Sequence, residues 1–174
     1  FLSKFSSQRL QGNASAMAAV EMALLDAYTR SRGKPFWRFF GRKLHQVTTD
    51  ITIVISPLPE TEKAAKKFYR QGLRTYKIKI GRDFDCDIKR VAAVAKIAPR
   101  VKLLLDANQA FSASETLAFL SQLKKRNIAP LLIEQPVPKK DWEGLEKVKR
   151  ESSVKVCADE SVASFKDALY VIRR

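Results

Sequence analysis

Residues 74–106 read RTYKIKIGRDFDCDIKRVAAVAKIAPRVKLLLD. The segment starts with a β-rich apolar run, passes a polar turn into a stretch whose apolar residues recur every three or four positions, and ends in a second apolar run. This order predicts a strand, an amphipathic helix and a second strand. The alternation recurs along most of the chain. Strands are predicted at 51–55, 74–80, 101–106, 130–134 and 154–159, and helices at about 60–71, 84–98, 113–126, 141–150 and 164–173.

Several of these helices carry start or stop signals. Ser112 and Glu115 form a capping box, Ser164 and Asp167 form a weaker one, and Gly72 ends the first helix. Strict alternation of strand and helix predicts a parallel sheet, which is either open and doubly wound or closed as a barrel. The segment ITIVISPLPET has no glycine for a phosphate loop after the first strand, which favours the barrel. The expected fold is α/β, a part of a (β/α) TIM-type barrel with about five strand-helix units.

A helix is predicted before the barrel, at 13–31. It follows the capping residues Asn13 and Ser15 and ends at Gly33, which a proline follows closely. A linker leads to about residue 46, and the strand-helix pattern starts at about Val47. We therefore expect two parts, 1–46 and 47–174.

Composition limits the possible functions. With 174 residues and 45% hydrophobic residues, the chain predicts one ordinary core, and its apolar runs are too short to cross a bilayer. Two cysteines and a single histidine, His45, argue against disulfides, a zinc site and a Ser-His-Asp triad, and they fit a reducing compartment. The formal net charge of +15 is spread over several helix faces, so we expect no nucleic-acid partner. A non-catalytic basic binding module remains the alternative from another functional class.

Three acids follow three of the apolar runs, in LLLDANQAF, LLIEQP and VCADES. They are Asp106, Glu134 and Asp159. In a barrel all three are expected at the same face, where active sites are built. Carboxylates brought together repel one another and raise their pKa values, and a hard divalent cation relieves that repulsion. Oxygen ligands without His or Cys favour Mg²⁺.

Two lysines, Lys77 and Lys79, lie two residues apart in YKIKIG, so their side chains share one face of the strand. If this face lines the barrel interior, Tyr76, Ile78 and Ile80 face the helices. Like charge and desolvation would then lower the lysine pKa values towards the range of a general base. An exposed lysine pair is the alternative.

The motifs KIKIG, LDANQAF, IEQP and ADES, in this order and spacing, resemble the enolase superfamily. The similarity is greatest to the muconate-lactonizing subgroup, and within it to the dipeptide epimerases. It covers most of the chain. It implies that residues 1–46 are the C-terminal part of a capping domain with its linker, and that 47–174 are strands one to five of the barrel.

The resemblance also implies roles for individual residues. Lys79 is the acid/base on one face of the substrate α-carbon, and Lys77 assists it by contacting the substrate carboxylate. Asp106, Glu134 and Asp159 are the Mg²⁺ ligands, Thr52 contacts the substrate, and Asn108 and Glu160 orient ligands and lysines. The implied reaction is proton abstraction next to a carboxylate, with the resulting enolate stabilised by magnesium.

The implied function is a cytoplasmic, magnesium-dependent epimerase of the L-Ala-D/L-Glu type that acts on a small carboxylate substrate, expected to be a dipeptide. We expect the full-length enzyme to be a homo-oligomer. The family's barrel continues past a fifth strand, with a second lysine on the sixth and amine-binding acids on the eighth, so we expect this chain to be truncated. o-Succinylbenzoate synthase and muconate cycloisomerase, of the same superfamily, remain alternatives.

Overall fold

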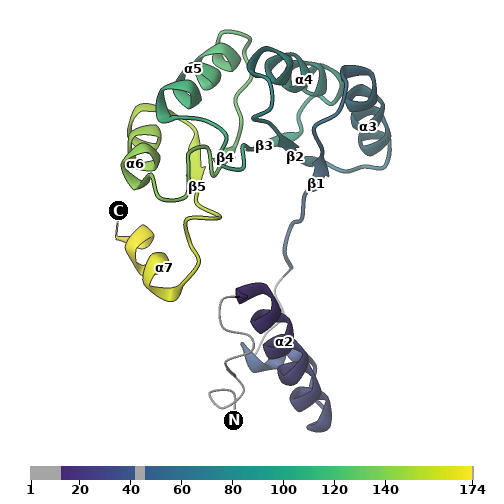
Figure 1. Cartoon of the computed structure of the whole chain (residues 1–174). Helices are drawn as coiled ribbons and strands as arrows, with labels where there is room; N and C mark the ends of the chain where they lie inside the picture. Colours follow the sequence, from purple (N-terminus) through teal and green to yellow (C-terminus); the bar gives the residue numbers. More distant parts are fainter. Residues whose placement is uncertain (1–12, 42–45, 174) are drawn as a thin grey trace. The chain divides into compact units, whose positions relative to one another are not determined.

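The computed structural model describes residues 13–41 and 46–173 and divides the chain into two compact units at residues 48 and 49 (Figure 1). The first unit contains α2 (Ala14–Ser31) and the 3-10 helix η1 (Phe36–Phe39). The Asn13 side chain accepts a hydrogen bond from the Ala16 amide at 3.0 Å, which confirms it as the N-cap of α2. His45 lies outside the described residues, and the assignment of 1–46 to a capping domain stays a prediction.

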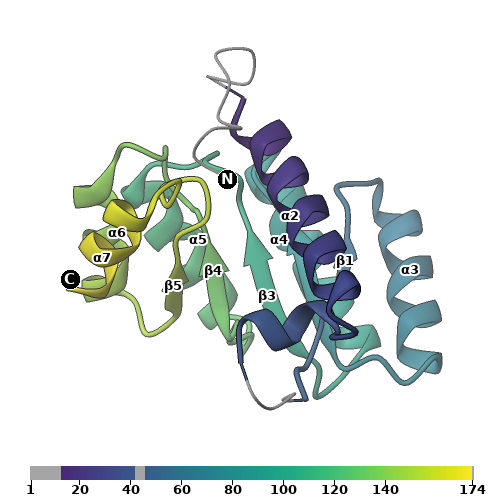
Figure 2. The same ribbon diagram turned by 90° about the horizontal axis from the view of Figure 1, so that it is seen from below.

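The second unit is a parallel sheet whose described strands follow one another in the order β1-β2-β3-β4-β5. The strands are β1 (Ile51–Ile53), β2 (Thr75–Lys79), β3 (Lys102–Asp106), β4 (Leu132–Glu134) and β5 (Lys155–Cys157). Figure 2 shows β3 and β4 side by side and running in the same direction. An order without reversal is that of a (β/α) barrel, since a doubly wound sheet reverses its strand order at a switch point. The α/β, barrel-type fold expected from the sequence is confirmed.

The helices α3, α4, α5 and α6 lie on one side of the sheet (Figure 1). The helices of this unit are α3 (Leu58–Arg70), α4 (Phe84–Ile97), α5 (Ala113–Lys124), α6 (Trp142–Glu151) and α7 (Phe165–Ile172). The core contains inward residues of the strands, such as Ile78, Leu105 and Ile133, together with Val91 of α4 and Phe119 of α5. All five residues have 0% exposed surface. Burying them stabilises the unit by about 1.5–3 kcal/mol per large apolar side chain.

The predicted helix termini agree well with the structure. Both bonds of the capping box between Ser112 and Glu115 are present, and the Ser164 side chain caps α7 by accepting from the Asp167 amide. Gly72 has φ 81° just after α3, the left-handed conformation expected of a glycine that follows a helix. The basic side chains of α3 are largely solvated, as expected for an outer helix face. They are Lys63, Lys66, Lys67 and Arg70.

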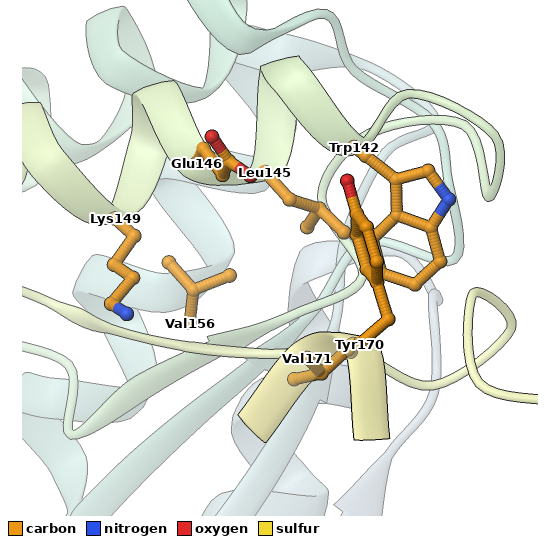
Figure 3. Close-up of a pocket in the computed structure, with 8 residues that line it drawn as sticks. Trp142, Leu145, Glu146, Lys149, Val156, Tyr170 and Val171 are labelled. Atoms are coloured by element: carbon orange, nitrogen blue, oxygen red, sulfur yellow. The ribbon is translucent and has the colours of Figure 1, made fainter. Parts of the chain in front are cut away.

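The helix α7 packs against α6. The rings of Trp142 and Tyr170 meet edge to face with centroids 4.9 Å apart, beside a cavity of about 140 Å³ (Figure 3). Val156 of β5 also lines this cavity. Val156 pairs with the fully buried Ile133 and so belongs to the helix side of the sheet. The polar strand ends described below lie on the other side. No helix among the described residues is long and apolar enough to cross a bilayer.

Candidate active site

A row of polar residues crosses the carboxyl ends of three neighbouring strands. Lys79 pairs in register with Asp106, and Asp106 pairs with Glu134. Each of the three is the last residue of its strand. The residues just before them, Ile78, Leu105 and Ile133, are fully buried under the helices. Because side chains alternate along a strand, the row projects from the opposite face of the sheet.

Both lysines reach the acids of this row. The Lys77 Nζ donates to Glu134 Oε1 at 2.7 Å and lies 3.2 Å from Asp106 Oδ2. The Lys79 Nζ donates to the same Asp106 oxygen at 3.0 Å and also to Asn108 Oδ1. The predicted arrangement of YKIKIG is therefore confirmed: Lys77 and Lys79 share the polar face, while Tyr76, Ile78 and Ile80 lie in the core with the helices. The lysines are not a free, exposed pair.

The predicted pKa shifts need correction at two residues. Burial lowers the pKa of Lys77, but hydrogen bonds to Glu134 and Asp106 outweigh burial, so this pKa is raised rather than lowered. Burial raises the pKa of Asp106, yet hydrogen bonds from Lys79, Lys77 and the Asn108 amide hold it below its usual range. The expectation treated lysines and acids as separate like-charged groups. In the structure opposite charges alternate, and Lys77 and Asp106 each stabilise the charged form of the other.

Asp159 stands apart from the row. The strand β5 ends at Cys157, which pairs with Glu134, and Asp159 follows two residues later with an exposed side chain. It nevertheless lies near the other acids. Burial raises the pKa of the Cys157 thiol, and the negative charges of Glu134, Asp159 and Asp106 raise it further. The three predicted acids thus all act electrostatically on one thiol, although only Asp106 and Glu134 are neighbours in the sheet.

The remaining predicted residues border this region. Asn108 Nδ2 donates to Glu160 Oε1 at 3.3 Å, which links the loops after β3 and β5. The other carboxylate oxygen of Glu160, Oε2, is buried without a hydrogen-bond partner. Thr52 pairs with Lys77 in register, so its side chain lies on the polar face of the sheet. All the candidate residues therefore lie on or beside one face of the sheet, most of them at its carboxyl end. Their catalytic and binding roles stay predictions.

The donor set fits a hard cation, although the acids are engaged by lysines. Among the described residues, no three Asp, Glu, His or Cys side chains already form a metal-binding group. The carboxylates of Asp106, Glu134, Asp159 and Glu160 nevertheless outnumber the ammonium groups of the two lysines. One carboxylate oxygen, Glu160 Oε2, is buried without a partner. A local excess of negative charge with an unsatisfied oxygen is an environment that binds a divalent cation.

Two residues that shape the site were not predicted. Gln135 is fully buried and hydrogen-bonds the loops after β4 and β5. Asp87 is also fully buried, pairs with Arg90, and accepts the Gly81 amide at 2.6 Å and the Arg82 amide at 3.2 Å. It therefore holds the turn after the lysine strand. A polar residue inside the apolar segment LLIEQPVP is a signal that points to Gln135. Asp87 is hard to distinguish in sequence from the neighbouring acids of DFDCD, which are typical of a helix start.

Comparison with known proteins assigns this architecture to a family. The family described as enolase C-terminal domain-like matches residues 60–174. The chain belongs to that family. The enolase-superfamily resemblance expected from the motifs is confirmed.

Several of the proteins similar to this chain are named epimerases. The hydrophobic dipeptide epimerase of Citrifermentans bemidjiense is 47% identical over 165 residues, which cover 90% of this chain and 45% of that protein. A substrate-liganded structure of the L-Ala-D/L-Glu epimerase from Bacillus subtilis matches with a TM-score of 0.88 at 36% identity, over 96% of this chain and 47% of that one. The dipeptide epimerase from Enterococcus faecalis V583, complexed with Mg and the dipeptide L-Leu-L-Tyr, matches with a TM-score of 0.81 at 33% identity, over 89% of this chain and 44% of that one. The chain thus spans about half the length of the relatives it matches.

Proposed function

We propose that this chain carries the first half of the active site of a magnesium-dependent dipeptide epimerase. The observation that supports this most is the contact of both lysine amines with Asp106, at the carboxyl end of neighbouring parallel strands. This is the edge at which (β/α) barrels build active sites. The names of the relatives favour an epimerase over the synthase and cycloisomerase alternatives.

Lys79 is proposed as the acid/base on one face of the substrate α-carbon. Its amine is held by Asp106 and Asn108, so its nitrogen has a fixed position from which to take a proton from the α-carbon or return it. Lys77, whose pKa is raised, stays protonated and suits the second proposed role, pairing with the substrate carboxylate. Inversion needs another acid/base on the opposite face, which we expect from a segment other than these five strands.

Asp106, Glu134 and Asp159 would hold Mg²⁺, which supplies positive charge where negative charge develops on the substrate carboxylate. The support in this chain is the excess of carboxylates and the unsatisfied oxygen of Glu160. Glu160 and Asn108 link the loops after β5 and β3 and would keep the ligand loops in place. Thr52 would contact the substrate from β1. A cytoplasmic location and a homo-oligomeric full-length enzyme remain part of this proposal.

The test is epimerisation of dipeptides by the full-length protein. Lys79→Ala is expected to slow the conversion of L-Ala-L-Glu and of L-Leu-L-Tyr by about 10²- to 10⁴-fold or more, the range for a lost acid/base. Each epimer is incubated separately in heavy water, and the α-proton is followed by NMR. One epimer should still exchange its α-proton with solvent, because the group on the opposite face remains.

Lys102→Ala is the matched control, since Lys102 is an exposed lysine on the neighbouring strand β3. It should leave both rates unchanged. Epimerisation by Lys79→Ala at the parental rate, or equal exchange of both epimers, would show that Lys79 is not the base. Absence of any dipeptide turnover by the unmodified protein would refute the proposed substrate class.

A further inference from the structure

Gln135 follows the acid Glu134 directly and is completely buried, with 0% of its surface exposed. Its backbone has φ 33°, which a residue other than glycine adopts only when its surroundings enforce it. Its amide N–H donates to the Cys157 carbonyl at 2.8 Å, and its carbonyl accepts from the Gln109 amide at 2.8 Å. The loop after β3, the loop after β4 and the end of β5 therefore meet at this one residue.

The side-chain amide of Gln135 uses both its donors and its acceptor. Nε2 donates to the Val137 carbonyl at 3.0 Å and to Ser161 Oγ at 2.8 Å. Oε1 accepts from the Asp159 amide at 2.9 Å and from the Ser161 amide at 3.1 Å. Only a carboxamide offers two donors and an acceptor in one plane. A carboxylate at this position would accept the same amides but would lose at least one donation, whether ionised or protonated.

The groups held by Gln135 belong to the segment that carries Asp159 and Glu160. One oxygen binds the backbone on both sides of Glu160, and the Ser161 hydroxyl extends the contact by donating to the Lys139 carbonyl at 2.8 Å. The Asp159 backbone is thereby fixed, while its carboxylate is exposed and available to a ligand. Beyond the end of β5, the amides of Asp159 and Ser161 donate to the Gln135 side chain rather than to a neighbouring strand.

We propose that Gln135 is a positioning residue that holds the loop after β5 so that Asp159 and Glu160 face the acids of β3 and β4. This inference rests on the proposed function, because it assigns to Gln135 the geometry of the proposed Mg²⁺ site. In this role Gln135 would touch neither the ion nor the substrate, because its side chain is fully buried and its amide group already has protein partners. It acts through the backbone amides of residues 159 and 161.

The test compares Gln135→Glu, Ser161→Ala and the control Gln71→Glu in the full-length protein. Gln71 is exposed at the end of α3, so its substitution changes charge as Gln135→Glu does without touching the site. Mg²⁺ affinity is measured by calorimetry without substrate, and amide hydrogen exchange is followed over residues 157–163. Gln135→Glu should weaken Mg²⁺ binding by about 10- to 100-fold and speed exchange in that segment. Ser161→Ala should do both to a smaller extent.

The direction of the change in Mg²⁺ affinity distinguishes a positioning role of Gln135 from an effect of charge. Gln135→Glu makes the site more negative or leaves its charge unchanged, so a purely electrostatic effect would tighten Mg²⁺ binding or not alter it. Unchanged or tighter binding by folded Gln135→Glu overturns the inference. If that variant does not fold, Ser161→Ala alone provides the test. Parental Mg²⁺ affinity and parental amide exchange in Ser161→Ala would then overturn the inference. Failure of the unmodified protein to bind Mg²⁺ would instead refute the proposed function, and this role with it.

Discussion

The charge pattern of the site is decided by individual residues. Asp106 has 1% exposed surface, and one of its oxygens, Oδ2, lies 3.0 Å from the Lys79 amine and 3.2 Å from the Lys77 amine. Removing one partner from such a buried network leaves an uncompensated charge. The free-energy cost of that charge exceeds the stabilisation that the ion pair provides. The Asp106 side chain therefore holds both amines in place, and its loss would leave the two lysines without their shared partner.

Gly81 follows β2 and Ile80. Substituting it tests this arrangement at the scale of a single residue. Its φ is 106°, and a Cβ there would overlap the Cβ of Ala110. We expect Gly81→Ala to destabilise the protein by about 2–3 kcal/mol, because a strained backbone and a clash act together. Gly72→Ala is the matched control, since Gly72 also has positive φ, 81°, but no atom lies within 4 Å of an added Cβ.

The control substitution should cost only about 1 kcal/mol, from backbone strain alone. Chemical denaturation measures both variants. Equal losses would mean that the packing of Gly81 against Ala110 contributes nothing. Gly81→Ala should also disturb the hydrogen bond from the Gly81 amide to Asp87, at 2.6 Å, which amide exchange in residues 80–83 would report.

At the scale of elements, the periodicity of the sequence predicted every strand and helix of the second unit to within a few residues at each end. Two differences at strand ends have a clear physical cause. The fifth strand was expected to reach Asp159 but ends at Cys157, because the Asp159 amide donates to the Gln135 side chain instead of to a strand carbonyl. The fourth was expected from Pro130 but starts at Leu132. A proline has no amide N–H for the ladder.

The candidate site was predictable to the same degree. Alternation in YKIKIG placed both lysines on one face, and acids at strand ends placed Asp106 and Glu134 beside them. The salt bridges between these groups were not predictable, since they depend on the register of β2, β3 and β4. The bonds of Gln135 depend likewise on how loops distant in sequence meet. Periodicity reports which face a residue occupies but not which partner it meets across strands.

The capping box of α5 gives a pH-dependent prediction for an element. Hydrogen bonds from the Ser112 amide and hydroxyl, both at 2.7 Å, lower the pKa of Glu115 from its ordinary 4.5. A carboxyl with a lowered folded pKa stabilises the native state above its ordinary pKa, and this contribution is lost as pH falls through the folded pKa. Glu115→Gln should therefore melt at a lower temperature than the unmodified protein at pH 7, and the difference should narrow below pH 4.5.

Thermal melts from pH 7 to pH 3 measure this difference. Glu143→Gln is the control, because Glu143 is an exposed acid in the first turn of α6, where Asp141 and not a capping box caps the helix. This variant removes one first-turn charge only. The same pH dependence in both variants would assign the effect to the helix dipole rather than to the capping bonds.

At the scale of the whole chain, five similar strand-helix units bring their carboxyl ends to one edge of the sheet. The helices α3 to α6 cover one face, so the polar row is confined to the other. Each unit adds one strand and candidate site residues: Thr52 from β1, the lysines from β2, one acid each from β3 and β4, and Asp159 from the loop after β5. The same repetition has a structural consequence, because among the described residues β1 and β5 each pair with one strand only.

These two edges predict that the isolated 174-residue chain associates with itself. Unpaired strand edges present free N–H and C=O groups to other chains. The Cys157 carbonyl accepts from the Gln135 amide that follows β4, so the neighbouring Val156 backbone points to the open side of β5. Val156→Pro removes one edge donor without breaking a bond to β4, and should reduce association in sedimentation and light scattering across a range of concentrations. A chain that is monomeric at every concentration and unfolds cooperatively would show that the strand edges do not cause self-association. Val156→Pro would then change only the stability of the chain.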